Sequence, residues 1–223
     1  MNNISKEDYL SVIYKHQDAT GEIKSNVIAE KLQISQAAVT DMIKKLAKEK
    51  YILYERYKGI RLTVRGGDYA RNIVRRHRIW EVFLMKVIGM PWDKVHDEAN
   101  RLEHSCSDDL VDRIEKLLGF PEYDPHGDPI PSKDGKLPKL KKHLPLSGLK
   151  EGESGAVVRV NDFNGQLLAY ISRLGIGLNE MIRVKEKRGF DNSLLIQIKG
   201  KTCNISQTLA ENIFVEIKKV RGL

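Results

Sequence analysis

The sequence is poor in cysteine and lacks long apolar runs. Its two cysteines, Cys106 and Cys203, lie far apart, which argues against a disulfide framework and suits a reducing compartment. The N-terminus MNNISKEDYL has no basic segment followed by an apolar core, and no run of about 18 apolar residues occurs anywhere. We therefore expect a cytoplasmic protein that is neither exported nor membrane-spanning.

Sequence signatures of common enzymes are missing as well. No HExxH arrangement is present, and the C-terminal third has neither a glycine-rich phosphate loop nor a nucleophile constellation. A net charge of +8 favours a polyanionic partner instead, while 41% hydrophobic and 30% charged residues are ordinary for a folded chain of 223 residues. We predict two or three compact units and no enzymatic activity.

The N-terminal third has the pattern of a winged helix. Apolar residues at helical spacing predict helices over residues 4–16, 25–32 and 36–48. The short turn between the last two is typical of a helix-turn-helix, whose second helix enters the DNA major groove. Residues 51–57 and 60–64 alternate as two strands, which predicts a wing.

Positive charge is concentrated in the same stretch. Between Gln36 and Arg65 there are eight cationic and three acidic residues, so phosphate contacts are available where this fold would place DNA. A charge run is more often a solvated helix face, but here it coincides with a helix-turn-helix and a wing. We predict DNA contacts from the following side chains: Ser35, Gln36, Ala37, Thr40, Lys44, Arg56, Lys58 and Arg61.

The middle segment carries histidines and acidic residues at helical spacing. A helix predicted over residues 68–90 has His77 and Glu81 four positions apart, hence on one face. A second predicted helix, residues 91–104, aligns four polar side chains: His96, Asn100, Glu103 and His104. A single His and Glu at this spacing is usually a surface pair. Imidazoles and carboxylates converging from two helices instead suit a divalent transition metal, to which the first helix can add Asp8.

Three runs in this segment resemble a known family. They are RHRIWE at residues 76–81, VHDEANRLEH at residues 95–104 and PHGDPIP at residues 125–131. In order and spacing they look like the signature motifs of the DtxR/MntR family of metal-dependent repressors, and the winged helix before them is similar too. The resemblance covers nearly the whole chain.

The resemblance implies two metal sites per subunit beside a dimer interface. The activating site would use Asp8, Glu103 and His104, with the main-chain carbonyl of Asn100 as a further candidate. The other site would use three side chains, His77, Glu81 and His96. Three further candidates are His126, Asp124 and Asp162, whose carboxylate belongs to the C-terminal domain.

The chain departs from the family in three places. Asn100 stands where relatives carry Cys or Glu, Ser11 replaces a Glu of the two-manganese relatives, and Asp124 stands where some relatives have Cys. Relatives tuned to iron carry a thioether at the position of Asp8 and a thiol at that of Asn100. Oxygen donors at these positions favour Mn(II) as the effector, with Fe(II) as the alternative.

The C-terminal region changes to short strands. Residues 131–146 are rich in proline and lysine and are interpreted as a linker. Four alternating stretches predict strands: residues 156–160, 181–184, 194–198 and 213–217. The run LGIGLNE at residues 174–180 resembles the SH3-like FeoA module found at the C-terminus of many DtxR relatives.

We predict a mainly α protein with a small β domain. Its parts are an N-terminal winged helix-turn-helix (residues 1–70), a helical dimerisation and metal-binding domain (71–130), a linker (131–146) and an SH3-like β-barrel (147–223). The predicted function is a metal-dependent transcriptional repressor that binds an inverted-repeat operator in double-stranded DNA as a homodimer and controls metal-homeostasis genes, without a membrane or an organic cofactor. Two alternatives stay open: a metal-dependent hydrolase, and a winged-helix regulator that senses an organic ligand.

Overall fold

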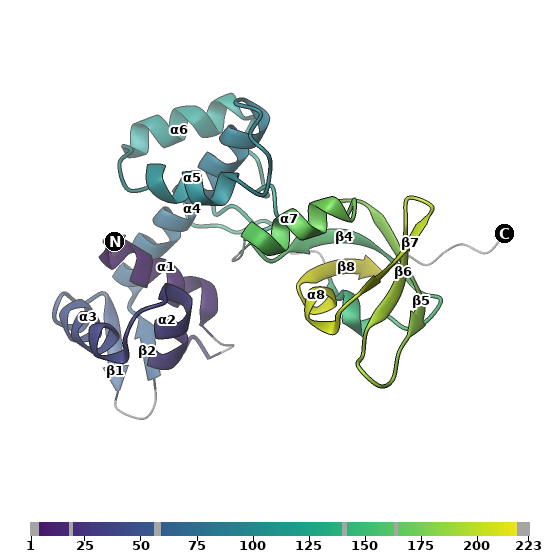
Figure 1. Ribbon diagram of the computed structural model, residues 1–223. Helices are drawn as coiled ribbons and strands as arrows, with labels where there is room; N and C mark the ends of the chain where they lie inside the picture. The colour runs from purple at the N-terminus through teal and green to yellow at the C-terminus, as the bar shows by residue number, and fades with distance from the viewer. Residues whose placement is uncertain (1–4, 18–19, 56–58, 140–141, 163–164, 218–223) are drawn as a thin grey trace. The chain divides into compact units, whose positions relative to one another are not determined.

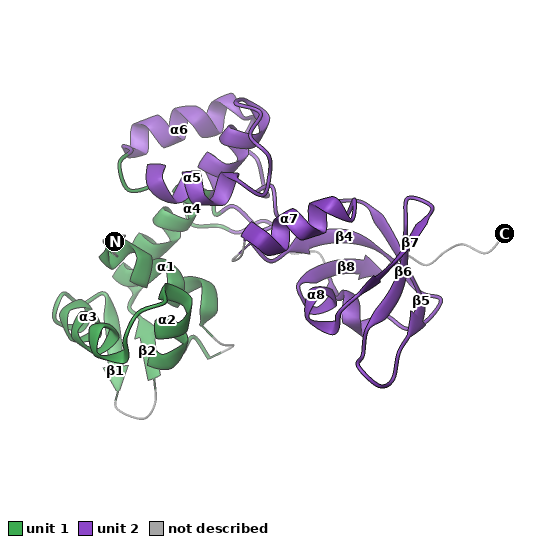
Figure 2. Cartoon of the chain, viewed as in Figure 1, with its two compact units in different colours: residues 1–77, 103–105, 131–136 green, residues 78–102, 106–130, 137–223 purple. Residues whose placement is uncertain are grey.

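The computed structural model describes residues 5–17, 20–55, 59–139, 142–162 and 165–217. It divides into two compact units, drawn in two colours in Figure 2. The first unit comprises residues 1–77, 103–105 and 131–136, and the second comprises residues 78–102, 106–130 and 137–223. Each unit has a hydrophobic core of its own. Within the described part of the chain, no helix combines the length and the apolar character that a membrane span requires.

The first unit contains three short helices (Figure 1): α1 (Lys6–His16), α2 (Ser25–Leu32) and α3 (Gln36–Lys48). Ser5 caps α1 and Ser35 caps α3, as their hydroxyls accept hydrogen bonds from the backbone of the first turns. Between α2 and α3 the chain reverses at Gln33, whose φ is +54°. The predicted helix-turn-helix is confirmed, and its apolar faces form the core of this unit.

The wing consists of β1 (Ile52–Glu55) and β2 (Gly59–Leu62), which pair antiparallel. Its tip, residues 56–58, lies outside the described residues. The prediction of a strand extending to Val64 was wrong, because Val64 is the first residue of α4 (Val64–Lys86). The hydroxyl of Thr63 accepts a hydrogen bond from the Gly66 backbone N–H (3.0 Å) and so caps this helix. A side chain at Gly66 would collide with the carbonyl of Tyr51.

Two more helices follow in the second unit, α5 (Val95–Leu102) and α6 (Asp108–Leu117). The predicted helices over residues 68–90 and 91–104 were therefore wrong at their ends. Pro91 begins a turn that is closed by the Lys94 backbone N–H (2.9 Å), so α5 starts later than predicted. Residues 103–105 form a turn after α5. Sequence reasoning missed α6, although Ser107 caps it and Val111 and Ile114 are buried on one face.

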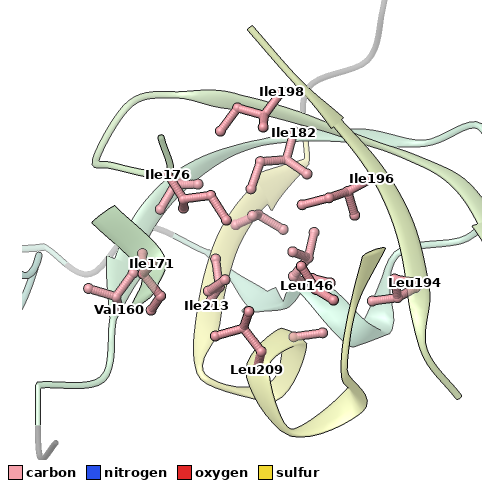
Figure 3. Close-up of a cluster of buried hydrophobic side chains, with 14 of the residues drawn as sticks. Leu146, Val160, Ile171, Ile176, Ile182, Leu194, Ile196, Ile198, Leu209 and Ile213 are labelled. Atoms are coloured by element: carbon pink, nitrogen blue, oxygen red, sulfur yellow. The ribbon is translucent and has the colours of Figure 1, made fainter. Parts of the chain in front are cut away.

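A six-stranded antiparallel sheet forms the rest of the second unit. Its order is β3-β8-β4-β5-β6-β7. The strands are β3 (Leu144–Pro145), β4 (Ser154–Val160), β5 (Met181–Lys187), β6 (Leu194–Ile198), β7 (Lys201–Ile205) and β8 (Ile213–Ile217). Helices α7 (Gly165–Arg173) and α8 (Gln207–Glu211) and the short 3-10 turn η1 (Leu146–Gly148) contribute to the same core, shown in Figure 3.

The fold class predicted from the sequence is confirmed: helical N-terminal parts are followed by a C-terminal β domain. All four predicted strands are present, but β7 and α7 were missed. Leu144 and Pro145, which fall in the predicted linker, form β3 and pair with β8. In the described residues the sheet is open, since its two outer strands, β3 and β7, do not pair with each other.

Candidate metal centre

The first unit brings three predicted ligands together: Asp8, Glu103 and His104. Each offers a ligand atom, and these atoms lie within 4.8 Å of one another. His104 Nε2 is 3.3 Å from Asp8 Oδ1 and 3.2 Å from Glu103 Oε1. The Glu103 side chain is buried, whereas 30% of Asp8 and 28% of His104 remain exposed. We call these three residues the open cluster, because water and ions can reach it.

Local structure fixes the carboxylates of the open cluster. Asp8 occupies the third position of α1, where its Oδ2 accepts hydrogen bonds from the backbone N–H (2.6 Å) and hydroxyl (2.9 Å) of Ser5. Its Oδ1 lies near His104 Nε2. Glu103 Oε2 is 2.6 Å from Nδ1 of the buried His77. Since a carboxylate has no proton to give, the His77 nitrogen is the donor.

Sequence reasoning missed Glu7, which touches the open cluster. Its Oε2 lies 2.6 Å from His104 Nδ1. Burial lowers the pKa of His104, but the hydrogen bond to Glu7 and the negative charges of Glu103 and Asp8 outweigh it and raise that pKa above its ordinary value. The signal available in the sequence was its place beside Asp8 in the first turn of α1.

The second unit holds another group of candidate ligands around Glu81, whose side chain is fully buried. His96 Nδ1 is 3.1 Å from Glu81 Oε1 and 3.4 Å from Asp162 Oδ2. Glu81 also forms a second group with Asp124 and His126, and within each group the ligand atoms lie within 4.8 Å of one another. We call these five residues the buried cluster.

His126 presents one ring nitrogen to the buried cluster. Its Nε2 is 2.9 Å from the backbone carbonyl of Trp92, so Nε2 carries the proton that it donates there. The other nitrogen, Nδ1, is 3.6 Å from Glu81 Oε2 and has no hydrogen-bond partner among the described residues. Asp124 Oδ1 accepts hydrogen bonds from the His126 and Asp128 backbone N–H groups, both at 2.9 Å.

The charges of the buried cluster shift its pKa values strongly upward. Burial alone lowers the pKa of both histidines, but nearby carboxylates raise it to about 10 for His96 and to about 9 for His126. Burial, with the charges of Glu81 and Asp128, raises the pKa of Asp124 to about 7. Protons therefore sit among these groups at neutral pH, at positions where a cation can replace them.

His77 and Asn100 are the other two ligands predicted from the sequence. His77 belongs to the first unit and lies one turn before Glu81 along α4. Its Nδ1–H donates a hydrogen bond to Glu103. Asn100 is an exposed residue of α5, so the prediction that it shares a helical face with Glu103 and His104 was wrong. The turn after α5 re-aims those two side chains. A ligand role for the Asn100 carbonyl stays a prediction.

The donor chemistry of both clusters fits a divalent transition metal. Carboxylate oxygens and imidazole nitrogens are the ligands that Mn(II) and Fe(II) accept, and neither cluster contains a thiolate. In the buried cluster, His126 Nδ1 is a buried atom that faces a carboxylate oxygen of Glu81. A proton or a metal ion is required between two such acceptors.

The predicted DNA contacts lie on the exposed face of α3 and on the wing. Gln36, Ala37, Thr40 and Lys44 are exposed, while Val39 on the opposite face is buried. The Thr40 hydroxyl donates to the Gln36 carbonyl (2.8 Å).

Arg61, a predicted DNA contact on β2, forms an ion pair with Glu22. Its Nη2 is 2.6 Å and its Nε 2.9 Å from Glu22 Oε1. The predicted contacts Arg56 and Lys58 lie outside the described residues.

Comparisons with known proteins match most of the chain. Three family models match in succession: the iron dependent repressor N-terminal DNA binding domain (residues 3–60), the iron dependent repressor metal binding and dimerisation domain (63–132) and the FeoA domain (144–217). Over 120 residues the chain is 37% identical to the HTH-type transcriptional regulator MntR of Bacillus pumilus (strain SAFR-032). The matched segment covers 54% of this chain and 83% of that protein.

Solved structures extend the match to nearly the full length. A manganese-dependent transcriptional repressor in complex with manganese is 36% identical with a TM-score of 0.87, covering 96% of this chain and all of that one. The chain belongs to the DtxR family of metal-dependent repressors. The manganese regulator SloR is 35% identical (TM-score 0.79), and ScaR with bound Zn²⁺ is 35% identical (TM-score 0.81), each covering 96% of this chain and 99% of that one.

Membership of the DtxR family decides between the functions considered above. The chain is a metal-dependent transcriptional repressor and not an enzyme, which removes the hydrolase alternative. Its domains imply operator DNA and a second subunit as partners. A purely organic effector does not fit a family defined by metal-dependent repression.

Proposed function

We propose that the chain is a Mn(II)-responsive repressor, cytoplasmic and homodimeric, that binds an inverted-repeat operator and controls metal-homeostasis genes. The observation that carries this proposal is the open cluster, in which Asp8 of α1 meets Glu103 and His104 from a distant part of the sequence. A bound divalent ion would supply the positive charge that this set of acceptors lacks. Asp8 ties that charge to the helices that read DNA, because α1 packs on α2 and α2 packs on α3.

The mechanism is a linkage between two equilibria. When Asp8, Glu103 and His104 are drawn together, α1 is held in one position and α3 with it. An ion that binds this arrangement more tightly than the open one shifts the population toward it. By reciprocity, operator DNA must then raise the affinity of the open cluster for the ion.

The proposed preference for Mn(II) rests on the donors of the open cluster. Two carboxylates and one imidazole are hard ligands, and Mn(II) gains little from the softer thioether and thiol of iron-responsive relatives. Similar solved structures carry manganese-dependent names. Fe(II) is the alternative, since the Irving–Williams order favours it over Mn(II) at a fixed site.

The proposed DNA contacts divide by their chemistry. Gln36, Ala37 and Thr40 lie at the N-terminal end of α3 and would face bases, while Lys44 and Arg61 would meet phosphates. A homodimer presents two such helices related by a two-fold axis, so the operator is proposed to be an inverted repeat. The buried cluster is proposed as the second metal site. The domain boundaries are proposed as predicted from the sequence, except that Leu144 and Pro145 of β3 belong to the C-terminal domain.

A mobility-shift titration tests the proposal directly. The protein is titrated against DNA from its own promoter region after chelator treatment and then with Mn(II), Fe(II) under anaerobic conditions, or Mg(II) added back. The proposal expects little specific binding with chelator and strong binding with Mn(II). Operator binding that is indifferent to chelation would contradict it, whereas restoration at much lower free Fe(II) than Mn(II), after allowing for their intrinsic affinity order, would overturn only the manganese assignment.

A further inference from the structure

Glu7 holds two partners at once, one on each carboxylate oxygen. Oε1 accepts a hydrogen bond from the Tyr69 hydroxyl at 2.6 Å, and Oε2 lies 2.6 Å from His104 Nδ1. Since the Tyr69 hydroxyl already donates to Oε1, the proton in the short contact at Oε2 is assigned to the imidazole, and the Nδ1–H of His104 is the donor.

This hydrogen bond decides which nitrogen of His104 faces the open cluster. With the proton held on Nδ1, the lone pair of a neutral imidazole is on Nε2. That atom lies 3.3 Å from Asp8 Oδ1 and 3.2 Å from Glu103 Oε1. A carboxylate that fixes the tautomer and the ring orientation of a ligand histidine is a common outer partner in metal sites.

Tyr69 in turn holds Glu7. Its hydroxyl comes from the first turns of α4, whereas Glu7 lies in the first turn of α1, so one hydrogen bond ties the two helices beside the open cluster. Glu7 and Asp8 are neighbours in sequence, yet they have different surroundings. Asp8 Oδ1 lies near His104 Nε2. The two Glu7 oxygens instead accept hydrogen bonds from the Tyr69 hydroxyl and from Nδ1 of His104.

We propose that Glu7, held by Tyr69, is a positioning residue of the metal site: it keeps the proton of His104 on Nδ1 so that Nε2 is presented to the ion. This inference rests on the proposed function, because it assumes that the open cluster binds the metal. Outer partners of this kind typically change metal affinity by about 10- to 100-fold when removed.

The test compares three variants with the wild type. Mn(II) affinity of the open cluster, defined as the site that Glu103→Ala removes, is measured by competition with a chelating dye. Glu7→Ala removes the acceptor and is expected to weaken binding about 10- to 100-fold. Glu7→Gln keeps an acceptor oxygen without the charge and is expected to recover most of the loss. Tyr69→Phe leaves Glu7 in place but unheld, so its loss should be smaller than that of Glu7→Ala.

A spectroscopic readout shows the role of His104 itself. With Cd(II) as a diamagnetic probe, proton–nitrogen correlation spectra of the histidine rings report which nitrogen binds metal, and His104→Gln identifies the His104 signal. We expect Nε2 bound with a protonated Nδ1 in the wild type, and loss of this single form in Glu7→Ala. Glu30→Ala, which removes an exposed carboxylate from α2 of the same unit, is the matched control and should leave affinity and spectrum unchanged.

The outcomes separate this inference from the proposed function. Equal losses in Glu7→Ala and Glu7→Gln would show that only charge at the start of α1 matters and would overturn the positioning role. Wild-type affinity and an unchanged His104 spectrum in Glu7→Ala would overturn it too. If Glu103→Ala itself removed no Mn(II) site, the proposed function of the open cluster would fail first.

Discussion

The two candidate clusters are built from the same types of side chain but differ in burial, since the second has a fully covered centre and only His96 and Asp162 at its rim are partly exposed. In the open cluster, Asp8 and His104 keep roughly three tenths of their side chains exposed. In the buried cluster, Glu81 and His126 are completely covered. An ion can exchange readily at the first position and only with difficulty at the second. The open cluster is therefore the one placed to act as a sensor, while the buried cluster, the proposed second metal site, also helps to hold its unit together.

Removing a ligand of the open cluster should have the largest functional effect. Glu103→Ala should reduce metal-stimulated operator affinity by more than about 100-fold, because Glu103 is a proposed ligand rather than an outer partner. This change also removes the buried partner of His77, so the folded state of the variant must be checked alongside its response. A mobility-shift assay measures the response, and size-exclusion chromatography checks the dimer. A variant that still responds fully to metal would show that the open cluster is not the sensing site. The proposed difference in role between the two clusters would then be wrong.

Removing the centre of the buried cluster should instead cost stability. Glu81→Ala leaves the fully buried His126 and the partly exposed His96 without their shared carboxylate, and breaking a buried ion pair typically costs about 3–5 kcal/mol. Urea denaturation of the chelator-treated protein measures the loss, with the wild type as the reference. If Glu81→Ala were as stable as the wild type, the buried cluster would have no structural role in the metal-free protein.

The pH dependence of the metal-free protein should sharpen the same contrast. The raised pKa values of His96 (about 10) and His126 (about 9) mean that their ion pairs stabilise the fold fully below pH 6.5 and lose this effect as pH rises toward 9 and 10. Asp124, with a pKa of about 7, adds a loss between pH 4 and 7, because its carboxyl ionises more easily in the unfolded chain.

Thermal melts in the presence of chelator measure this decline. The midpoint for the second unit should fall steadily between pH 6.5 and 9.5, and added Mn(II) should restore more stability at the alkaline end, where fewer protons compete for the ligands. A flat profile, or one that rises over this range, would show that the buried histidines are neutral in the folded protein.

The sequence predicted the partners of the open cluster but not its geometry. Helical spacing placed Glu103 and His104 on one face with His96, whereas α5 ends at Leu102 and the following turn aims them at α1 instead. Periodicity alone cannot locate such an end, because no proline or glycine marks it. Glu7 was missed for a related reason: its partner His104 is 97 residues away, and only the tertiary fold brings the two together.

The C-terminal region shows the same limit at the level of strands. Alternating apolar residues identified β4, β5, β6 and β8, all of which contribute buried side chains to one core. β7 has the sequence KTCNI with one buried residue, Ile205, so it carries too few apolar positions to be recognised. Edge strands are half solvated and depend on pairing with a neighbour, here β6, rather than on their own pattern.

The smallest expected effects concern the DNA contacts of the first unit, where charge is exposed and stability should not change. Lys44 is 71% exposed and lies 4.0 Å from Asp41, an interaction too weak to neutralise it. Arg61 instead makes two short contacts with one oxygen of Glu22. A phosphate must compete with Glu22 for Arg61 but not with Asp41 for Lys44. Lys44→Ala should therefore lower the salt dependence of operator binding by about 0.9, the amount expected for one lost phosphate contact, and Arg61→Ala by less.

Glu22→Gln provides the matched control for this difference. Removing the carboxylate frees the Arg61 guanidinium, so this variant should bind DNA more tightly and with a steeper salt dependence than the wild type. In the Glu22→Gln background, Arg61→Ala should then cost as much as Lys44→Ala. Fluorescence anisotropy with labelled operator between 50 and about 200 mM salt measures both slopes. Equal slopes for Lys44→Ala and Arg61→Ala in the wild-type background would mean that Glu22 releases Arg61 without cost on DNA binding. The ion pair of Arg61 on the wing could then be exchanged for a phosphate contact. Glu81 and His126 of the buried cluster have no such alternative partner, because both are fully covered.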